Sequence, residues 1–158
     1  MSAVFTYGSL MFEPVWSMVV STPGRAPMPA TINGYQRFCV RGETYPAIVA
    51  VADGQVSGML YVDVTDEQLA TLDAFEGSDY QRIEVAAGLT APSTEQKTQP
   101  AAVSPAASVV PTDVRAWVYL FLNESALDTR MWDPVRFESR DMAGFMRTYR
   151  PTGNRLKP

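Results

Sequence analysis

The chain has 158 residues, of which 46% are hydrophobic and 19% are charged, with a formal net charge of −4. This length and composition are ordinary for one globular domain with a substantial core. The scattered basic residues argue against nucleic-acid binding, which needs a gathered basic surface. No apolar run approaches the roughly 18 residues of a membrane-spanning helix. We therefore expect a single domain over residues 1–158 that binds neither nucleic acid nor membrane. The sequence leaves its oligomeric state open.

The chain contains no histidine and a single cysteine, Cys39. Ser-His-Asp and Cys-His nucleophile systems are thereby excluded in their usual forms, as are His-based zinc sites. Cys39 lies in a strand-like run and is interpreted as a small apolar residue. Neither of the common glycine-rich phosphate-binding motifs is present. We expect no metal and no cofactor, so any proton chemistry must fall to a carboxylate, a tyrosine or a lysine.

The first elements in chain order are a short strand, a helix and two hairpins. Residues 3–6 predict a strand that runs into the segment Tyr7-Gly8-Ser9-Leu10. The N-terminus lacks the pattern of a secretory signal, which favours a cytoplasmic location. Pro14 suits the first position of a helix over residues 13–20. Asn33-Gly34 predicts a turn between strands 30–32 and 35–40, and Asp53-Gly54 predicts one between strands 47–51 and 56–64.

The clearest helix follows residue 65. Thr65 and Gln68 form a capping box, apolar residues recur at helical spacing, and Gly77 is a natural C-terminal stop. A strand is expected over residues 80–86.

Residues 89–112 are rich in Pro, Ala, Ser and Thr, which predicts a flexible surface insertion within the one domain. A strand resumes at 115–122, and a last helix is expected from Trp132-Asp133-Pro134 to about residue 149. Its expected core anchors are Phe137, Phe145 and Met146. Together the elements predict an α+β fold with a curved, mostly antiparallel sheet or small barrel.

Three segments are candidates for a functional site. One is Tyr80-Gln81-Arg82, where alternation puts Tyr80 and Arg82 on one face of the expected strand, although an outer-face pair with a solvated arginine is equally compatible. In Tyr7-Gly8-Ser9-Leu10, a backbone turned by glycine between a strand and a helix can point N–H groups at an anion, although such a segment is also compatible with a plain turn. Glu76 is the last residue before Gly77, so its carboxylate meets the negative end of the helix dipole. If Glu76 also faces an apolar cavity, both effects raise its proton affinity, as a general acid/base requires. The alternative is an exposed glutamate in water.

The order of several segments resembles the γ-glutamylcyclotransferase-like family, and within it the AIG2-like and γ-glutamylamine cyclotransferase branch. The segments that carry the resemblance are Tyr7-Gly8-Ser9-Leu10, Asn33-Gly34-Tyr35-Gln36-Arg37, Tyr45-Pro46-Ala47-Ile48, Val56-Ser57-Gly58-Met59-Leu60-Tyr61, Leu72-Asp73-Ala74-Phe75-Glu76-Gly77, Tyr80-x-Arg82-x-x-Val85 and Ala116-Trp117-Val118-Tyr119. The resemblance implies a small mixed, mostly antiparallel β-barrel flanked by helices.

The resemblance also implies a site. The family's catalytic glutamate falls on Glu76, its substrate-binding loop on residues 7–10, and aromatic residues near the site on Tyr80 and Tyr119. The implied partner is a small γ-glutamyl compound, whose α-amine attacks its own γ-carbonyl to release 5-oxoproline and an amine. Two alternatives stay open: a non-catalytic binding or regulatory module on the same fold, and an enzyme that acts on a different amide.

Overall fold

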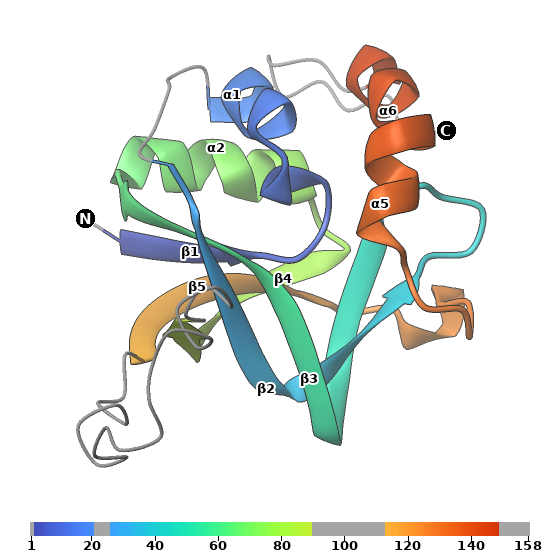
Figure 1. Cartoon of the computed structure of the whole chain (residues 1–158), viewed down its shortest axis with the longest axis horizontal. Coiled ribbons are helices and arrows are strands. Elements are labelled where there is room, and N and C mark those ends of the chain that lie inside the picture. The colour runs from blue at the N-terminus through green and yellow to red at the C-terminus, as the bar shows by residue number, and fades with distance from the viewer. Residues whose placement is uncertain (1, 21–25, 90–112, 149–158) are drawn as a thin grey trace, which may run out of the picture.

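The computed structural model describes residues 2–20, 26–89 and 113–148, which form a closed five-stranded barrel with helices packed on its outside (Figure 1). Around the barrel the strand order is β1-β3-β2-β4-β5. β1 pairs antiparallel with β3 and parallel with β5, and every other pairing is antiparallel. The expected α+β fold with a mixed, mostly antiparallel barrel is confirmed. The strands are β1 (Ser2–Thr6), β2 (Met28–Cys39), β3 (Pro46–Val64), β4 (Tyr80–Leu89) and β5 (Asp113–Phe121).

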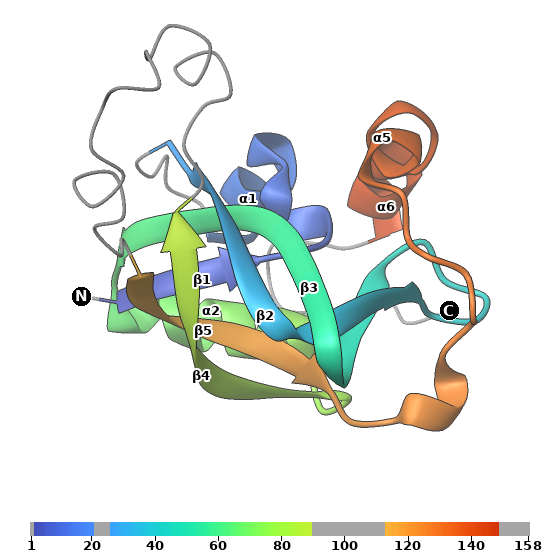
Figure 2. The same ribbon diagram turned by 60° about the horizontal axis from the view of Figure 1, so that its bottom comes forward.

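The helices cover two parts of the barrel. α1 (Glu13–Val20) and α2 (Asp66–Glu76) contact each other on one side, and the C-terminal helices stand beside the start of β3 (Figures 1 and 2). The C-terminal part comprises α5 (Pro134–Arg136), the π-helical turn η3 (Phe137–Asp141) and α6 (Met142–Thr148). Short 3-10 turns are η1 (Ser9–Met11) and η2 (Glu124–Ala126). Among the described residues, no helix is long and apolar enough to cross a membrane.

The bounds of α2 follow from its local sequence as predicted. Thr65 and Gln68 form both hydrogen bonds of the capping box, at 3.1 Å and 3.0 Å. At the other end Gly77 has φ of 78°, and its N–H donates to the carbonyl of Asp73 at 3.0 Å. This cap fixes Glu76 as the last residue of the helix.

The two predicted hairpins are wrong, because each is a single long strand. β2 pairs with β3 from Met28 opposite Leu60 to Cys39 opposite Pro46, so the chain reverses between residues 40 and 45 instead. The pairing is irregular only between Asn33 and Tyr35. Asn33-Gly34 and Asp53-Gly54 meet at this point, where Gly34 has φ of 87° and a Cβ on Gly54 would lie 2.2 Å from the carbonyl oxygen of Tyr35. The glycines therefore bend two strands around the barrel rather than turning the chain back.

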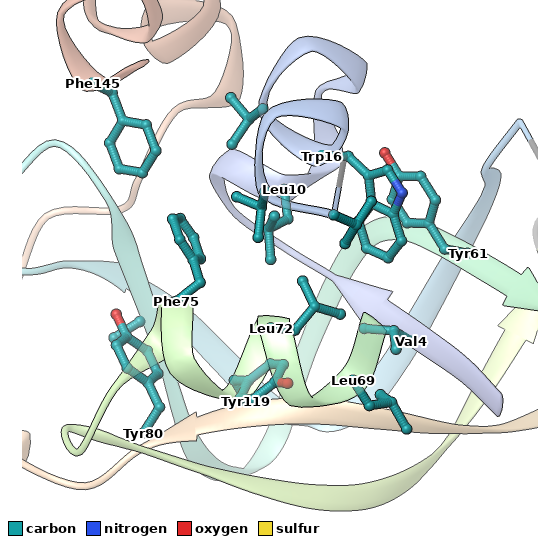
Figure 3. Close-up of a cluster of buried hydrophobic side chains, with 14 of the residues drawn as sticks. Val4, Leu10, Trp16, Tyr61, Leu69, Leu72, Phe75, Tyr80, Tyr119 and Phe145 are labelled. Atoms are coloured by element: carbon teal, nitrogen blue, oxygen red, sulfur yellow. The ribbon is translucent and has the colours of Figure 1, made fainter. Parts of the chain in front are cut away.

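Two apolar clusters hold the fold together. One fills the barrel and includes Phe5, Ile32 and Leu60. The other lies between the barrel and the helices, where Trp16 stacks on Tyr61 at 3.7 Å and Leu72 is fully buried (Figure 3). The second cluster also brings the C-terminal helices against α2, which matters for the site.

The structure differs at the ends of several predicted segments. β4 continues through Leu89, and the rest of the expected insertion lies outside the described residues, as does residue 149 at the expected end of the last helix. Asp133 caps that helix by accepting from the N–H of Val135 at 3.0 Å. Phe137 and Phe145 are buried and Met146 is half-buried, as their anchoring role requires.

Candidate active site

A small cavity of about 30 Å³ lies where β1 ends, between the C-terminus of α2, the start of β3 and α6. The cavity brings together the seven residues that the family resemblance implies for the site: Tyr7, Gly8, Ser9, Leu10, Glu76, Tyr80 and Tyr119. The other described residues of its lining are Phe5, Thr6, Tyr45, Pro46, Phe75 and Phe145.

The segment after β1 forms one wall of the cavity. Gly8 packs so closely on Pro46 that a Cβ would lie 2.8 Å from Cδ and Cγ of the proline ring. Ser9 is buried and begins the 3-10 turn in which the N–H of Met11 donates to the carbonyl of Gly8 at 3.0 Å. None of the turn and loop hydrogen bonds among the described residues is donated by the backbone amides of Gly8, Ser9 or Leu10. Because the first N–H groups of a helical turn have no acceptor within that turn, these three amides are candidate donors on this segment.

Three of the four tyrosines that line the cavity donate their hydroxyl protons to protein acceptors. Tyr7 donates to the carbonyl of Tyr119 at 2.7 Å, Tyr119 to Oδ1 of Asp73 at 2.8 Å, and Tyr80 to the carbonyl of Pro46 at 3.1 Å. Burial raises the pKa of Tyr7 and of Tyr119 well above the usual range, and the hydrogen bond to Asp73 raises that of Tyr119 further. Tyr7 and Tyr119 are therefore neutral at physiological pH and do not act as bases there.

Glu76 lies on the cavity at the end of α2 and is half-buried. Among the described residues of the lining it has the only charged side chain. Its negative charge contributes to the raised pKa of Tyr7 and of Tyr119, which places its carboxylate within electrostatic reach of both hydroxyls. The alternative of a fully exposed Glu76 in water is therefore wrong, because the side chain is half-buried at the cavity. Its catalytic role stays a prediction.

Phe75 and Phe145 complete the cavity and were not predicted as site residues. Phe145 of α6 points toward Phe75 of α2, with ring centroids 6.2 Å apart in an edge-on arrangement (Figure 3). Both carried only an apolar signal in the sequence. Their meeting depends on tertiary packing between elements far apart in the chain, which periodicity does not encode.

Asp73 is a further residue that sequence analysis did not predict for the site. Besides accepting from Tyr119, it pairs with Arg82, whose Nε lies 3.4 Å from Oδ1. The Arg82 guanidinium stacks over the Trp117 ring at 4.7 Å. Asp73 thus holds Tyr119 in place from one helical turn before Glu76.

The described residues contain no group of three or more side chains placed to hold a metal ion. Cys39 lies away from the cavity, half-buried on β2, and burial raises the pKa of its thiol. A reactive thiolate is not what this environment favours.

A closed mixed β-barrel flanked by helices is the fold of γ-glutamylcyclotransferase-like proteins. The family model described as gamma-glutamyl cyclotransferase, AIG2-like, matches residues 4–136, and the chain belongs to this family. Residues 137–148, which include Phe145, lie beyond that match.

Sequence and structure comparisons agree with this assignment. Protein AIG2 C of Arabidopsis thaliana is 38% identical over 82 residues, which are 52% of this chain and 49% of that protein. A solution structure of an Arabidopsis thaliana protein is 26% identical with a TM-score of 0.62, covering 93% of this chain and 78% of that one. A structure titled gamma-glutamyl cyclotransferase shares the fold at 13% identity and a TM-score of 0.54, covering 80% and 68% of the two chains. The matched part spans between 49% and 62% of the first three curated relatives.

Proposed function

We propose that the chain is a γ-glutamyl cyclotransferase that releases 5-oxoproline, with Glu76 as its general acid and base. The observation that carries this proposal is that Glu76 and residues 8–10 line one cavity whose other described side chains are uncharged. Family membership supports a cyclotransferase in general terms. The leaving group and the residue roles belong to the proposal.

The reaction needs one proton carrier and a rigid binding wall. The substrate's α-amine attacks its own γ-carbonyl carbon, which forms the C–N bond of a five-membered lactam. Glu76 takes a proton from the attacking nitrogen and delivers it to the departing nitrogen as the original amide C–N bond breaks. Because the nucleophile is tethered to the carbonyl, holding a folded conformer can lower the barrier by several kcal/mol.

The loop after β1 would supply the second element of catalysis. The amides of Gly8, Ser9 and Leu10 are the donors proposed to bind the γ-glutamyl group and to stabilise the oxyanion that forms on the γ-carbonyl. The hydroxyls of Tyr7 and Tyr119 already donate within the protein, so they shape the cavity rather than protonate the substrate.

The test is to assay 5-oxoproline from a panel of γ-glutamyl amines, γ-glutamyl dipeptides and γ-glutamyl-ε-lysine. Glu76→Gln keeps the size of the side chain and removes its basicity, so kcat should fall at least about a hundredfold, in line with other general acid/base residues. Glu67→Gln is the matched control, because Glu67 is exposed in the first turn of the same helix and does not line the cavity. It should keep wild-type activity.

Each other outcome has a distinct meaning. Product that survives Glu76→Gln would refute the role of Glu76 while leaving the reaction class standing. Binding of γ-glutamyl compounds without any product, in folded protein, would favour the binding module instead. Activity on another amide with the γ-glutamyl panel untouched would assign the site to a different substrate.

A further inference from the structure

Arg37 of β2 is a half-buried cation that contacts the backbone of the loop after β1 from the side away from the cavity. Its Nη1 donates to the carbonyl of Tyr7 at 2.7 Å and to the carbonyl of Ser57 at 3.2 Å. It does not belong to the described lining of the cavity, so it does not face the space where substrate would lie. The Asn33–Arg37 segment stood out in the sequence, yet the proposed function gives it no task.

The surroundings of Arg37 hold it in a single place. Its guanidinium lies 5.3 Å from the centroid of the Trp132 ring, and the indole N–H of Trp132 donates to the carbonyl of Thr44 at 2.8 Å. Stacking on an aromatic face and a fork of donors suit arginine specifically. Burial lowers the pKa of Arg37, but a guanidinium remains charged at any physiological pH. A fixed positive charge therefore sits against the Tyr7 carbonyl.

The Tyr7 carbonyl and the Gly8 N–H belong to one planar peptide group. A cation hydrogen-bonded to the oxygen draws electron density through the conjugated C–N bond, and the N–H becomes a stronger donor. A hydrogen bond of 2.7 Å to a charged group is at the strong end of the range. The same bond fixes the plane of the peptide and so the direction of the Gly8 N–H.

We propose that Arg37 is a positioning residue for the reaction, which orients the Tyr7–Gly8 peptide and strengthens the Gly8 N–H as a donor to the substrate's γ-carbonyl oxygen. This inference rests on the proposed function, because it assigns that amide to the developing oxyanion. It assigns Arg37 no contact with the substrate. Charge at residue 37 should therefore affect the chemical step more than substrate binding.

The experiment compares Arg37→Met, Arg37→Gln and Arg37→Lys with the control Arg115→Met. Arg115 has a side chain that is 81% exposed and lies on β5, away from the cavity lining. Each variant is measured for kcat and KM on the best γ-glutamyl substrate, for its thermal unfolding, and for the Gly8 amide proton shift in ¹⁵N-labelled protein without substrate.

We expect Arg37→Met and Arg37→Gln to lower kcat by about tenfold or more with KM changed less than about threefold, because weakening one oxyanion donor costs less than the 10²–10³ of removing one. Their Gly8 amide proton should move upfield. Arg37→Lys keeps the charge but not the fork of donors, so it should recover part of kcat and of the shift, while Arg115→Met should match wild type. If the Met variant does not fold, the Gln variant carries the same test, since it keeps a donor for the carbonyls.

A folded Arg37→Gln with wild-type kcat, or with an unmoved Gly8 signal, would overturn the inference. So would a loss confined to KM or to thermal stability. Absence of turnover in the wild type would refute the proposed function instead. The change in the Gly8 amide proton shift in the Arg37 variants would still decide whether Arg37 polarises this peptide.

Discussion

Gly8→Ala is the sharpest perturbation of the candidate site, because the structure identifies the atoms with which the new side chain would clash. The new Cβ would lie 2.8 Å from Cδ and Cγ of Pro46, where ordinary contact begins at 3.4 Å. The loop and the proline must therefore separate by about 0.6 Å, since packed interiors leave little slack. Both sides of this contact line the cavity, so the displacement falls on the proposed binding wall.

The expected size of the effect follows from this displacement. A misplacement of about 1 Å at a reacting centre can cost on the order of a hundredfold in rate. A shift of about 0.6 Å should thus lower kcat/KM by about tenfold or more, which corresponds to about 1.4 kcal/mol of transition-state stabilisation. Overpacking of this kind should also lower the free energy of unfolding by about 1–3 kcal/mol.

The assay is 5-oxoproline release together with urea unfolding, run on Gly8→Ala, Pro46→Ala and the double variant. Pro46→Ala removes both clashing ring carbons, and the Pro46 carbonyl that accepts from Tyr80 remains. The double variant should therefore recover activity relative to Gly8→Ala alone. Gly144→Ala is the control, because its Cβ would meet nothing closer than 3.8 Å. Wild-type kcat/KM in Gly8→Ala, or no recovery in the double variant, would refute the steric argument.

Two further results are expected. The folded-state pKa of Tyr7 and of Tyr119 is raised above the usual tyrosine value of 10.0, so the full stability contribution of both residues is present below pH 10. It should fall by about 1.4 kcal/mol per pH unit for each residue above pH 10, where only the unfolded chain loses these protons. Absorbance at 295 nm should then show both tyrosinates appearing with unfolding, and their ionisation in folded protein near pH 10 would contradict this account. Phe145→Leu should lower the free energy of unfolding by about 1–3 kcal/mol, because Phe145 packs edge-on against Phe75 and Phe137. It should also raise kcat/KM more for bulky leaving groups than for small ones, and an unchanged ratio would show that Phe145 does not bound the substrate.

Features encoded by neighbouring residues were predictable from the sequence. The capping box of Thr65 and Gln68 and the stop at Gly77 fix both ends of α2, and so the place of Glu76. The first strand and the turn at Gly8 likewise depend on adjacent residues. These signals act over one helical turn or less, so they can be recognised in the sequence without knowledge of the fold.

Features set by barrel closure were not predictable in this way. Asn33-Gly34 has the chemistry of a hairpin turn, yet Gly34 bends a strand whose partner is bent at the same level by Gly54. Only the pairing of two long strands decides between a turn and a kink, because the same backbone freedom serves both. Phe145 is a similar case, since an apolar helix position does not reveal which wall it covers.

The arrangement of the tyrosines explains why the proposed chemistry concentrates on one side chain. Tyr7 and Tyr119 are neutral and already donate their protons, to the Tyr119 carbonyl and to Asp73. Removing either hydroxyl would disturb the shape of the cavity without removing a proton carrier, whereas Glu76→Gln would remove the carrier without altering the shape. Tyr119→Phe should therefore cost much less in kcat than Glu76→Gln, and a larger loss from Tyr119→Phe would move the proton transfer from Glu76 to the tyrosine.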